Sequence, residues 1–297
     1  MEGAILFWAW EPIPETPTTF PEPSRNKEAA MGTLQELLDR LWRDYSALNP
    51  QAGRIHGLLE ARGETIVNDH IAFRTFAHPG MDIQAMAASY VALGYVPGGN
   101  YVFPEKKLTA VHYRHPNPLN PKIFVSQIHL DQLSAGARSM LLGLINQVPP
   151  EFLSRPDWSA GGRPWNLDFT TYEALERESE YAAWMSAFGF RANHFTVFAN
   201  ALRTFPDLTR LNQYLKAQGF RLNASGGEIK GAPDIFLEQS STLANEAEAP
   251  FRDGVRKIPG CYYEFARRYA MPNGELFQGF NDKSADKIFE STDRKSR

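Results

Sequence analysis

Residues 68–76, Asn-Asp-His-Ile-Ala-Phe-Arg-Thr-Phe, are the stretch from which the fold can be worked out. They are rich in β-branched and aromatic residues, which predicts an extended strand whose side chains alternate between two faces. His70 and Arg74 then share one face, about 13 Å apart at roughly 3.3 Å per residue. Ile71 and Phe73 share the other face, which is plain core. The first face therefore offers an imidazole and a guanidinium that one small anion could bridge.

A second copy of this pattern lies at residues 193–198, Asn-His-Phe-Thr-Val-Phe. His70 precedes Gly94 by 24 residues, and His194 precedes Gly219 by 25 residues. Each interval has the pattern of a strand, a helix and a turn, so the matching spacing indicates a duplicated βαβββ unit. Two such units around a pseudo-twofold axis can curl into a half-open β-barrel. His70 and His194 would then meet inside it.

The predicted fold class is therefore α+β, with two repeats at about 66–130 and 190–270 and flanking helices. We expect one catalytic domain over residues 31–290. The Pro- and Thr-rich start, 1–30, is expected to be a disordered tail, and 291–297 a second tail.

Local patterns place further elements around the two repeats. Helical periodicity is found at 33–49, 82–93, 131–148, 172–188 and 207–218. Strand-like runs are found at 69–76, 101–103, 108–113, 123–128, 193–198, 221–224, 234–239 and 260–269. Pro50 is expected to lie beyond the end of the first helix.

Composition excludes several classes of function. The chain has 297 residues, 43% of them hydrophobic, which is enough for a large core. A net charge of -3 with no basic run argues against nucleic acid as a partner. No apolar run reaches the length of a membrane span. The single cysteine, Cys261, cannot form an internal disulfide, so we expect a reducing, cytoplasmic location. The oligomeric state stays open.

A metal ion held by His70 and His194 needs a third protein ligand. The best candidate is Glu264, within the β-prone run Gly-Cys-Tyr-Tyr-Glu-Phe-Ala at 260–266. A carboxylate amid aromatic residues is costly to bury unless a positive group compensates for it. A metal would do so, and so would an ion pair with Arg267 or Arg268. Two His and one carboxylate admit Fe, Mn, Co, Ni or Zn.

Four short motifs carry a resemblance to a known family. They are Asp-His-Ile-Ala-Phe-Arg-Thr-Phe at 69–76, Asn-His-Phe-Thr at 193–196, Leu-Glu-Gln-Ser-Ser-Thr at 237–242 and the run at 260–266. Together they resemble the 2-oxoadipate dioxygenase/decarboxylases, over about residues 33–292. The resemblance implies a vicinal-oxygen-chelate-like fold in which His70, His194 and Glu264 hold Fe(II) and Arg74 grips the substrate.

The implied reaction converts 2-oxoadipate and O₂ to (R)-2-hydroxyglutarate and CO₂, a step of lysine catabolism. The implied partners are thus a small 2-oxo dicarboxylate and O₂. Gln239 and Ser240 are candidate substrate-binding residues, with ordinary strand-end polarity as the alternative. Arg74 could instead neutralise a core carboxylate such as Glu228 or Glu238. Asp69 is expected to accept an imidazole N–H.

Two other functions remain open at this stage. One is a metal-dependent isomerase or lyase of the same superfamily, which consumes no O₂. The other is a non-catalytic paralogue that binds a small acid. The five remaining histidines have no matching partner and are interpreted as surface or satisfied core residues: His56, His78, His112, His115 and His129.

Overall fold

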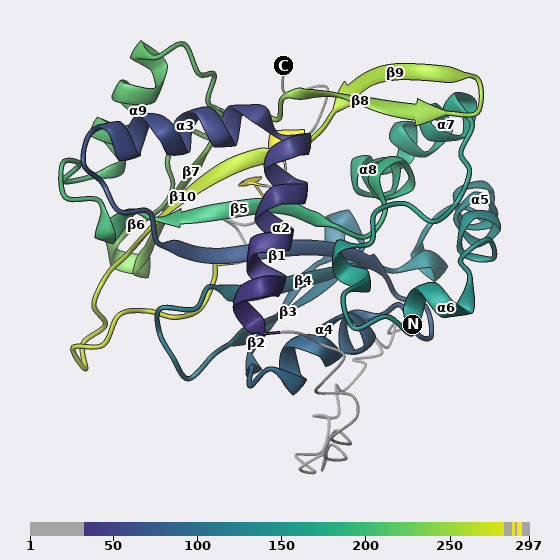
Figure 1. The fold of residues 1–297 in the computed structure, drawn as a ribbon, viewed down its shortest axis with the longest axis horizontal. Coiled ribbons are helices and arrows are strands. Elements are labelled where there is room, and N and C mark those ends of the chain that lie inside the picture. Colours follow the sequence, from purple (N-terminus) through teal and green to yellow (C-terminus); the bar gives the residue numbers. More distant parts are fainter. Residues whose placement is uncertain (1–32, 282–286, 289, 293–297) are drawn as a thin grey trace, which may run out of the picture.

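The computed structural model describes residues 33–281, 287–288 and 290–292, so the tail expected at 1–30 lies outside the described residues. In this part of the chain, eight strands form one curled sheet in the order β2-β3-β4-β1-β5-β10-β7-β6 (Figure 1). Their bounds are β1 Asn68–Phe76, β2 Val96–Phe103, β3 Leu108–Arg114, β4 Lys122–Ile128, β5 Ala192–Phe198, β6 Lys230–Ala232, β7 Leu237–Ser241 and β10 Tyr262–Arg268.

The two halves of this sheet have the same connectivity. β1 pairs in parallel with β4, and β5 pairs in parallel with β10. The two remaining strands of each half continue outward in antiparallel pairing. β1 and β5 pair antiparallel at the centre, where the halves meet. The predicted α+β half-barrel of two βαβββ units is thereby confirmed.

Helices cover the outer face of the sheet and its ends. They are α2 Leu34–Leu48, α3 Pro50–Ala61, α4 Ile83–Ala92, α5 Ala135–Ile145, α6 Pro150–Leu153, α7 Phe169–Glu178, α8 Glu180–Phe188 and α9 Leu208–Ala217. α2 starts with a capping box in which Thr33 and Glu36 each accept the other's backbone N–H. It crosses the front of the sheet in Figure 1, and its buried Tyr45 ring lies 4.9 Å from that of Phe195 on β5.

Helix boundaries differ from the sequence predictions for local reasons. Pro50 lies beyond the end of α2, as predicted, but it also begins a separate helix, α3, since proline is well tolerated at the first helical position. The helix expected at 172–188 is two helices, because Ser179 is extended and its hydroxyl accepts the Ala182 N–H as the cap of α8. The helix expected at 131–148 begins only after Ser134, which caps α5.

The second repeat departs most from its predicted strands. The run at 221–224 is reduced to a bridge between Leu222 and Thr242. β7 starts at Leu237, after a 3-10 turn at Pro233–Ile235. A hairpin of β8, Glu246–Phe251, and β9, Gly254–Pro259, was not predicted. It is inserted between β7 and β10, so the second repeat is longer than the first.

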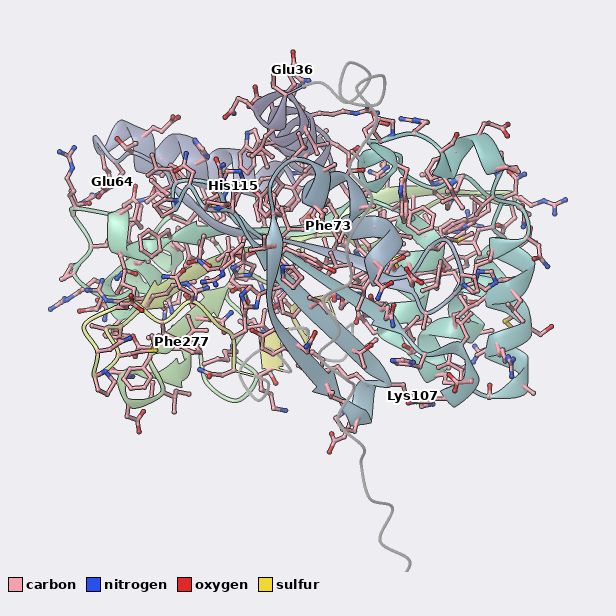
Figure 2. All side chains as sticks on the ribbon, turned by 90° about the horizontal axis from the view of Figure 1, so that it is seen from below. Glu36, Glu64, Phe73, Lys107, His115 and Phe277 are labelled. Atoms are coloured by element: carbon pink, nitrogen blue, oxygen red, sulfur yellow. The ribbon has the colours of Figure 1, made fainter. Side chains whose placement is uncertain are left out.

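Side chains along each strand alternate between the helix-covered outer face of the sheet and its concave inner face. Phe73 is fully buried on the outer side, whereas Glu36 is exposed at the periphery (Figure 2). Ser291 and Thr292, expected in a tail, are buried instead, and the Ala244 N–H donates to the Ser291 carbonyl. None of the described helices is long and apolar enough to cross a membrane.

Candidate metal centre

The strand register brings the three expected ligands together on the inner face. Thr196 on β5 lies opposite His70 on β1 and opposite Glu264 on β10. His194 occupies the next inward position of β5, between Ala72 and Tyr262. The small Thr196 side chain separates the two outer ligands, and its hydroxyl is 3.1 Å from His70 Nε2. The repeat therefore places all three expected ligands around one point.

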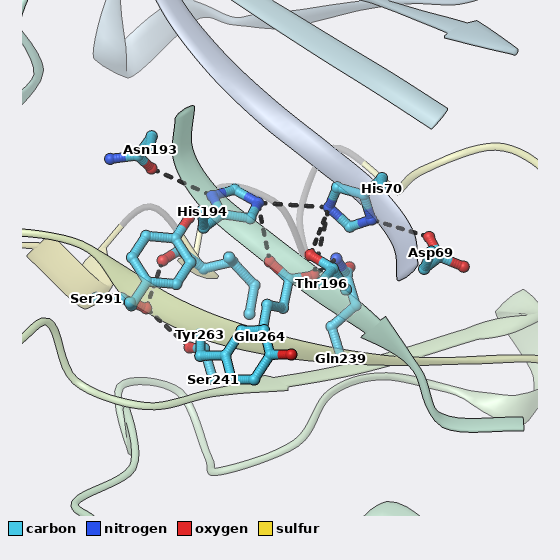
Figure 3. A network of polar contacts seen from close by, with 12 residues as sticks. Asp69, His70, Asn193, His194, Thr196, Gln239, Ser241, Tyr263, Glu264 and Ser291 are labelled. Atoms are coloured by element: carbon cyan, nitrogen blue, oxygen red, sulfur yellow. Dashed lines mark hydrogen bonds and ion pairs between the residues drawn. The ribbon is translucent and has the colours of Figure 1, made fainter. Parts of the chain in front are cut away.

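The ligand atoms are close enough to share one cation. One donor atom from each of His70, His194 and Glu264 lies within 4.8 Å of the others. The two imidazole Nε2 atoms are 3.4 Å apart, and His194 Nε2 is 3.2 Å from Glu264 Oε2 (Figure 3). Nitrogens bonded at about 2.1 Å and at right angles to one ion lie about 3 Å apart. The spacing fits a mononuclear metal site.

Two β-bulges orient the imidazoles. The pairing of β1 with β5 skips Asp69 on one strand and Asn193 on the other, so each bulged residue directly precedes a ligand histidine. Asp69 Oδ1 is 2.8 Å from His70 Nδ1, and Asn193 Oδ1 is 3.2 Å from His194 Nδ1. Each oxygen accepts a proton carried on Nδ1, which leaves the Nε2 lone pair for a metal. The predicted acceptor role of Asp69 is confirmed.

Glu264 needs a compensating positive charge. Its side chain is fully buried, and Gln239 Nε2 donates to Oε1 at 2.6 Å. Oε2 has no hydrogen-bond partner in the described part of the chain. The alternative ion pair with Arg268 is wrong, because that guanidinium binds Asp69 instead. Buried acceptor atoms that face one another are costly unless a cation lies between them, so these residues fit a metal ion.

Burial governs the charges of the ligands. It lowers the pKa of His70 and takes the pKa of His194 well below its usual value, which keeps both imidazoles neutral. Burial also raises the pKa of Glu264 to about 8, despite the hydrogen bond from Gln239. Without a metal ion, burial therefore favours the protonated form of Glu264 at neutral pH.

We expect metal affinity to rise with pH up to about 8, the raised pKa of Glu264. Below that pH a metal must displace the carboxyl proton, so affinity should rise by about tenfold per pH unit and then level off. The histidines add no slope there, since their pKa values are lowered. Because the folded pKa of Glu264 is raised, the metal-free fold loses stability as pH increases towards about 8. Cobalt(II) titrations between pH 6 and 9, with thermal unfolding of the metal-free protein, measure both trends.

Arg74 lies on the inner face but is already engaged. Its Nη1 is 2.8 Å from Glu180 Oε1 at the start of α8, and its Nη2 donates to Thr292 Oγ1 at 3.0 Å. The guanidinium carbon also lies 4.8 Å from the centre of the Tyr181 ring. The side chain is 1% exposed. Arg74 therefore has an acidic partner, as one alternative proposed.

That acidic partner is neither of the two named from the sequence. Glu228 pairs with Lys216 at 2.7 Å on the surface, and Glu238 accepts a hydrogen bond from Tyr269 at 2.6 Å. Glu180 could not be chosen from the sequence, since it lies in a helix between the two repeats. Only the packing of α8 against β1 brings it to Arg74.

The two candidate substrate-binding residues of β7 point to opposite faces. Gln239 reaches the metal site through Glu264. Ser240 pairs with Phe265 on the outer face, where its hydroxyl donates to Asn212 of α9 at 2.8 Å. Alternation along β7 therefore keeps Ser240 away from the site.

Replacement of Ser240 by alanine should leave substrate affinity and turnover unchanged. It removes one buried hydrogen bond and should lower stability by about 1 kcal/mol. Steady-state kinetics and denaturant unfolding would separate the two effects. A raised KM would return Ser240 to the substrate site.

Residues that the sequence did not single out close the site. The Phe280 ring lies edge-on to His70, with ring centres 4.8 Å apart. The Ser291 hydroxyl is 2.8 Å from that of Ser241, beside Glu264 on the inner face. His70, His194 and Glu264 are each no more than 4% exposed. The site is therefore shielded from solvent.

The other histidines stay outside the cluster, as expected. His112 is buried and its Nδ1 is 2.7 Å from the Tyr101 hydroxyl, and His129 lies 2.9 Å from the Thr109 hydroxyl. His56, His78 and His115 are not in the ligand group either. The described residues thus use two of seven histidines at the centre.

The fold and the site together define a class: a half-open barrel of two βαβββ units with a buried His-His-Glu centre between them. Comparison with known proteins narrows this class. The family model of the 2-oxoadipate dioxygenase/decarboxylases matches residues 24–154 and 146–277. The chain belongs to the 2-oxoadipate dioxygenase/decarboxylase family.

Individual relatives agree with this assignment. The chain is 33% identical over 297 residues to the chloroplastic 2-oxoadipate dioxygenase/decarboxylase of Arabidopsis thaliana, covering 91% of this chain and 80% of that one. The crystal structure of the hydroxyglutarate synthase from Oryza sativa in complex with 2-oxoadipate is 30% identical, with a TM-score of 0.81 over 97% of this chain and 99% of that one. A structure described as a putative hydrolase from Shewanella frigidimarina is 46% identical, with a TM-score of 0.80 over 84% and 99%.

Proposed function

We propose that this protein is an Fe(II)-dependent dioxygenase/decarboxylase that converts 2-oxoadipate and O₂ to (R)-2-hydroxyglutarate and CO₂. The observation that carries the proposal is the buried convergence of His70, His194 and Glu264. Bound Fe(II) would chelate the 2-oxo acid and activate O₂, since two His and one carboxylate leave positions open. The rice enzyme of the same fold was crystallised with 2-oxoadipate.

The chain's own residues supply orientation at this centre. Asp69 and Asn193 fix the Nδ1 protons, so both imidazoles present Nε2 inward. Gln239 holds one oxygen of Glu264, which leaves the other oxygen for the metal. The closed inner face keeps bulk water away, so the oxidising equivalents of O₂ are directed to the substrate.

We propose that Arg74 binds the distal carboxylate of the substrate. Its side chain lies on the same face of β1 as His70, four residues or about 13 Å further along the strand at roughly 3.3 Å per residue. Its planar guanidinium suits two parallel, charge-assisted hydrogen bonds to a carboxylate. Glu180 and Thr292 now occupy this fork, so substrate would replace or share them.

Oxygen consumption tests the proposed reaction. The protein is loaded with Fe(II) without oxygen and then supplied with 2-oxo diacids of four to seven carbons in an oxygen electrode. O₂ uptake equal to CO₂ release with 2-oxoadipate supports the proposal. Turnover without O₂ uptake would instead indicate a metal-dependent isomerase or lyase, and binding without turnover a small-acid-binding paralogue. Reloading with Mn, Co, Ni or Zn identifies the metal.

The cellular setting is also proposed. Cys261 is buried and is the single cysteine of the chain, which suits a reducing compartment such as the cytoplasm. The Arabidopsis relative is named chloroplastic.

We also propose that the reaction is a step of lysine catabolism. We therefore expect cells that lack this protein to accumulate 2-oxoadipate when they are fed lysine. Cell fractionation tests the proposed compartment, and measurement of 2-oxoadipate levels tests the proposed role in lysine catabolism.

A further inference from the structure

Arg268 lies behind the candidate metal centre and contacts no ligand directly. It ends β10, four residues beyond Glu264, and its side chain is 1% exposed. The side chain of Asn200 accepts the Arg268 N–H and donates to the Arg268 carbonyl, which fixes the backbone at this point. The backbone from which the Arg268 side chain extends is therefore held in place.

This guanidinium holds the carboxylate that orients His70. Arg268 Nε donates to Asp69 Oδ2 at 2.6 Å, and Nη2 donates to Oδ1 at 2.8 Å. Oδ1 is the same atom that lies 2.8 Å from His70 Nδ1. A bidentate pair of this kind fixes both the position and the plane of a carboxylate. The imidazole ring of His70 is therefore set through Asp69.

The same guanidinium also holds the segment that closes the site. Its Nη1 donates to the carbonyl of Phe277 at 2.9 Å and to that of Gly279 at 2.8 Å. The next residue, Phe280, places its ring against His70 and donates its N–H to the Tyr101 hydroxyl at 3.1 Å. We call residues 277–280 the covering segment.

The other half of the pseudo-symmetric centre lacks this arrangement. His194 is backed by the neutral amide of Asn193. In the part of the chain that the structure describes, no arginine or lysine hydrogen-bonds to the side chain of Asn193. The orientation of His194 therefore depends on a weaker, neutral contact, whereas that of His70 depends on a charged one.

We propose that Arg268 is a positioning residue that couples the covering segment to the orientation of His70 at the metal centre. The same guanidinium binds Asp69, which orients His70, and the backbone carbonyls of the covering segment. The position of His70 and that of the covering segment are therefore linked. The inference rests on the proposed metal centre and adds to it the residue that sets one of the ligands. Arg268 acts through Asp69 and the backbone, and it touches neither metal nor substrate.

The test compares Arg268→Lys with Arg267→Lys and uses Asp69→Asn to isolate one contact. Arg267 is the neighbouring arginine on the opposite face, near the ring of Tyr269, and serves as the matched control. Cobalt(II) affinity is measured by chelator competition, and the visible spectrum of the bound cobalt reports the ligand field. Hydrogen exchange of the peptide covering residues 269–281 reports the covering segment.

Arg268→Lys should weaken cobalt binding by about 10- to 100-fold, shift the cobalt spectrum and speed exchange in the covering segment. Asp69→Asn should weaken cobalt binding and shift the spectrum with a smaller change in exchange, since Arg268 keeps its two carbonyl contacts. Arg267→Lys should match the unsubstituted protein in all three measurements.

Arg268→Lys with unchanged cobalt affinity, or with unchanged exchange, would overturn the coupling. If that variant does not fold, Asp69→Asn decides: unchanged cobalt affinity and spectrum would overturn the proposal on its own. The proposed function fails separately, when the unsubstituted protein binds cobalt tightly but its iron form consumes no O₂ with any 2-oxo diacid.

Discussion

Replacement of Glu264 by alanine is expected to abolish metal binding and turnover together. Of the three proposed ligands, His70, His194 and Glu264, only Glu264 can carry a negative charge. Its loss therefore removes the group that partly neutralises a divalent ion in a fully buried site. Changes to residues that merely orient a ligand lower metal affinity by about 10- to 100-fold, so loss of a ligand should exceed 100-fold. Metal content after reconstitution, together with calorimetric titration, measures the effect.

The fold itself should tolerate this change. Burial raises the pKa of Glu264 to about 8, so the metal-free protein carries a buried acid whose removal relieves a cost at neutral pH. Glu228→Ala is the matched control, because Glu228 pairs with Lys216 on the surface. His70→Ala and His194→Ala should lose metal like Glu264→Ala. Full metal occupancy in any of the three variants would remove that residue from the centre.

Replacement of Arg74 by alanine is expected to keep the metal and lose the substrate. Each charge-assisted hydrogen bond contributes roughly 1.5–3 kcal/mol, so loss of two should weaken dicarboxylate binding by at least about 100-fold. Arg74→Lys should recover little of this affinity, because an ammonium cannot reproduce the planar fork. KM for 2-oxoadipate, with metal content measured in parallel, tests the prediction.

Glu180 supplies the control that separates substrate binding from stability. It holds Arg74 Nη1 at 2.8 Å and is 25% exposed, so it competes with a substrate carboxylate for the same donor. Glu180→Gln should keep or improve substrate affinity if Arg74 binds the substrate. An unchanged KM in Arg74→Ala would show that Arg74 does not bind the substrate and has only a structural role, as the ion-pair partner of Glu180.

The ligand trio could be predicted from sequence because the repeat encodes it. Strand alternation places His70 inward, and the duplicated spacing gives His194 the equivalent position in the second half. Glu264 was recognisable as an acid within an apolar strand. The bulges at Asp69 and Asn193, by contrast, appear only in the strand pairing of the structure.

Contacts between distant segments that the repeat does not relate could not be predicted. Glu180 is 106 residues from Arg74, and Thr292 is 218 residues from it, with no shared pattern to connect them. Nothing in the sequence distinguishes Phe280 from the other aromatic residues. Its contact with His70 arises only because the loop after β10 brings the ring there. Ser240 was misplaced because strand register, which fixes the face, depends on pairing with β10.

The central claim is that one metal ion is held by residues from both repeats. Anomalous diffraction from crystals grown with Fe(II) or Co(II) tests it most directly. The account predicts one strong peak at about 2.0–2.2 Å from Nε2 of His70, Nε2 of His194 and a carboxylate oxygen of Glu264. A peak elsewhere, or full-occupancy binding that leaves any of these three atoms unbonded, would contradict it.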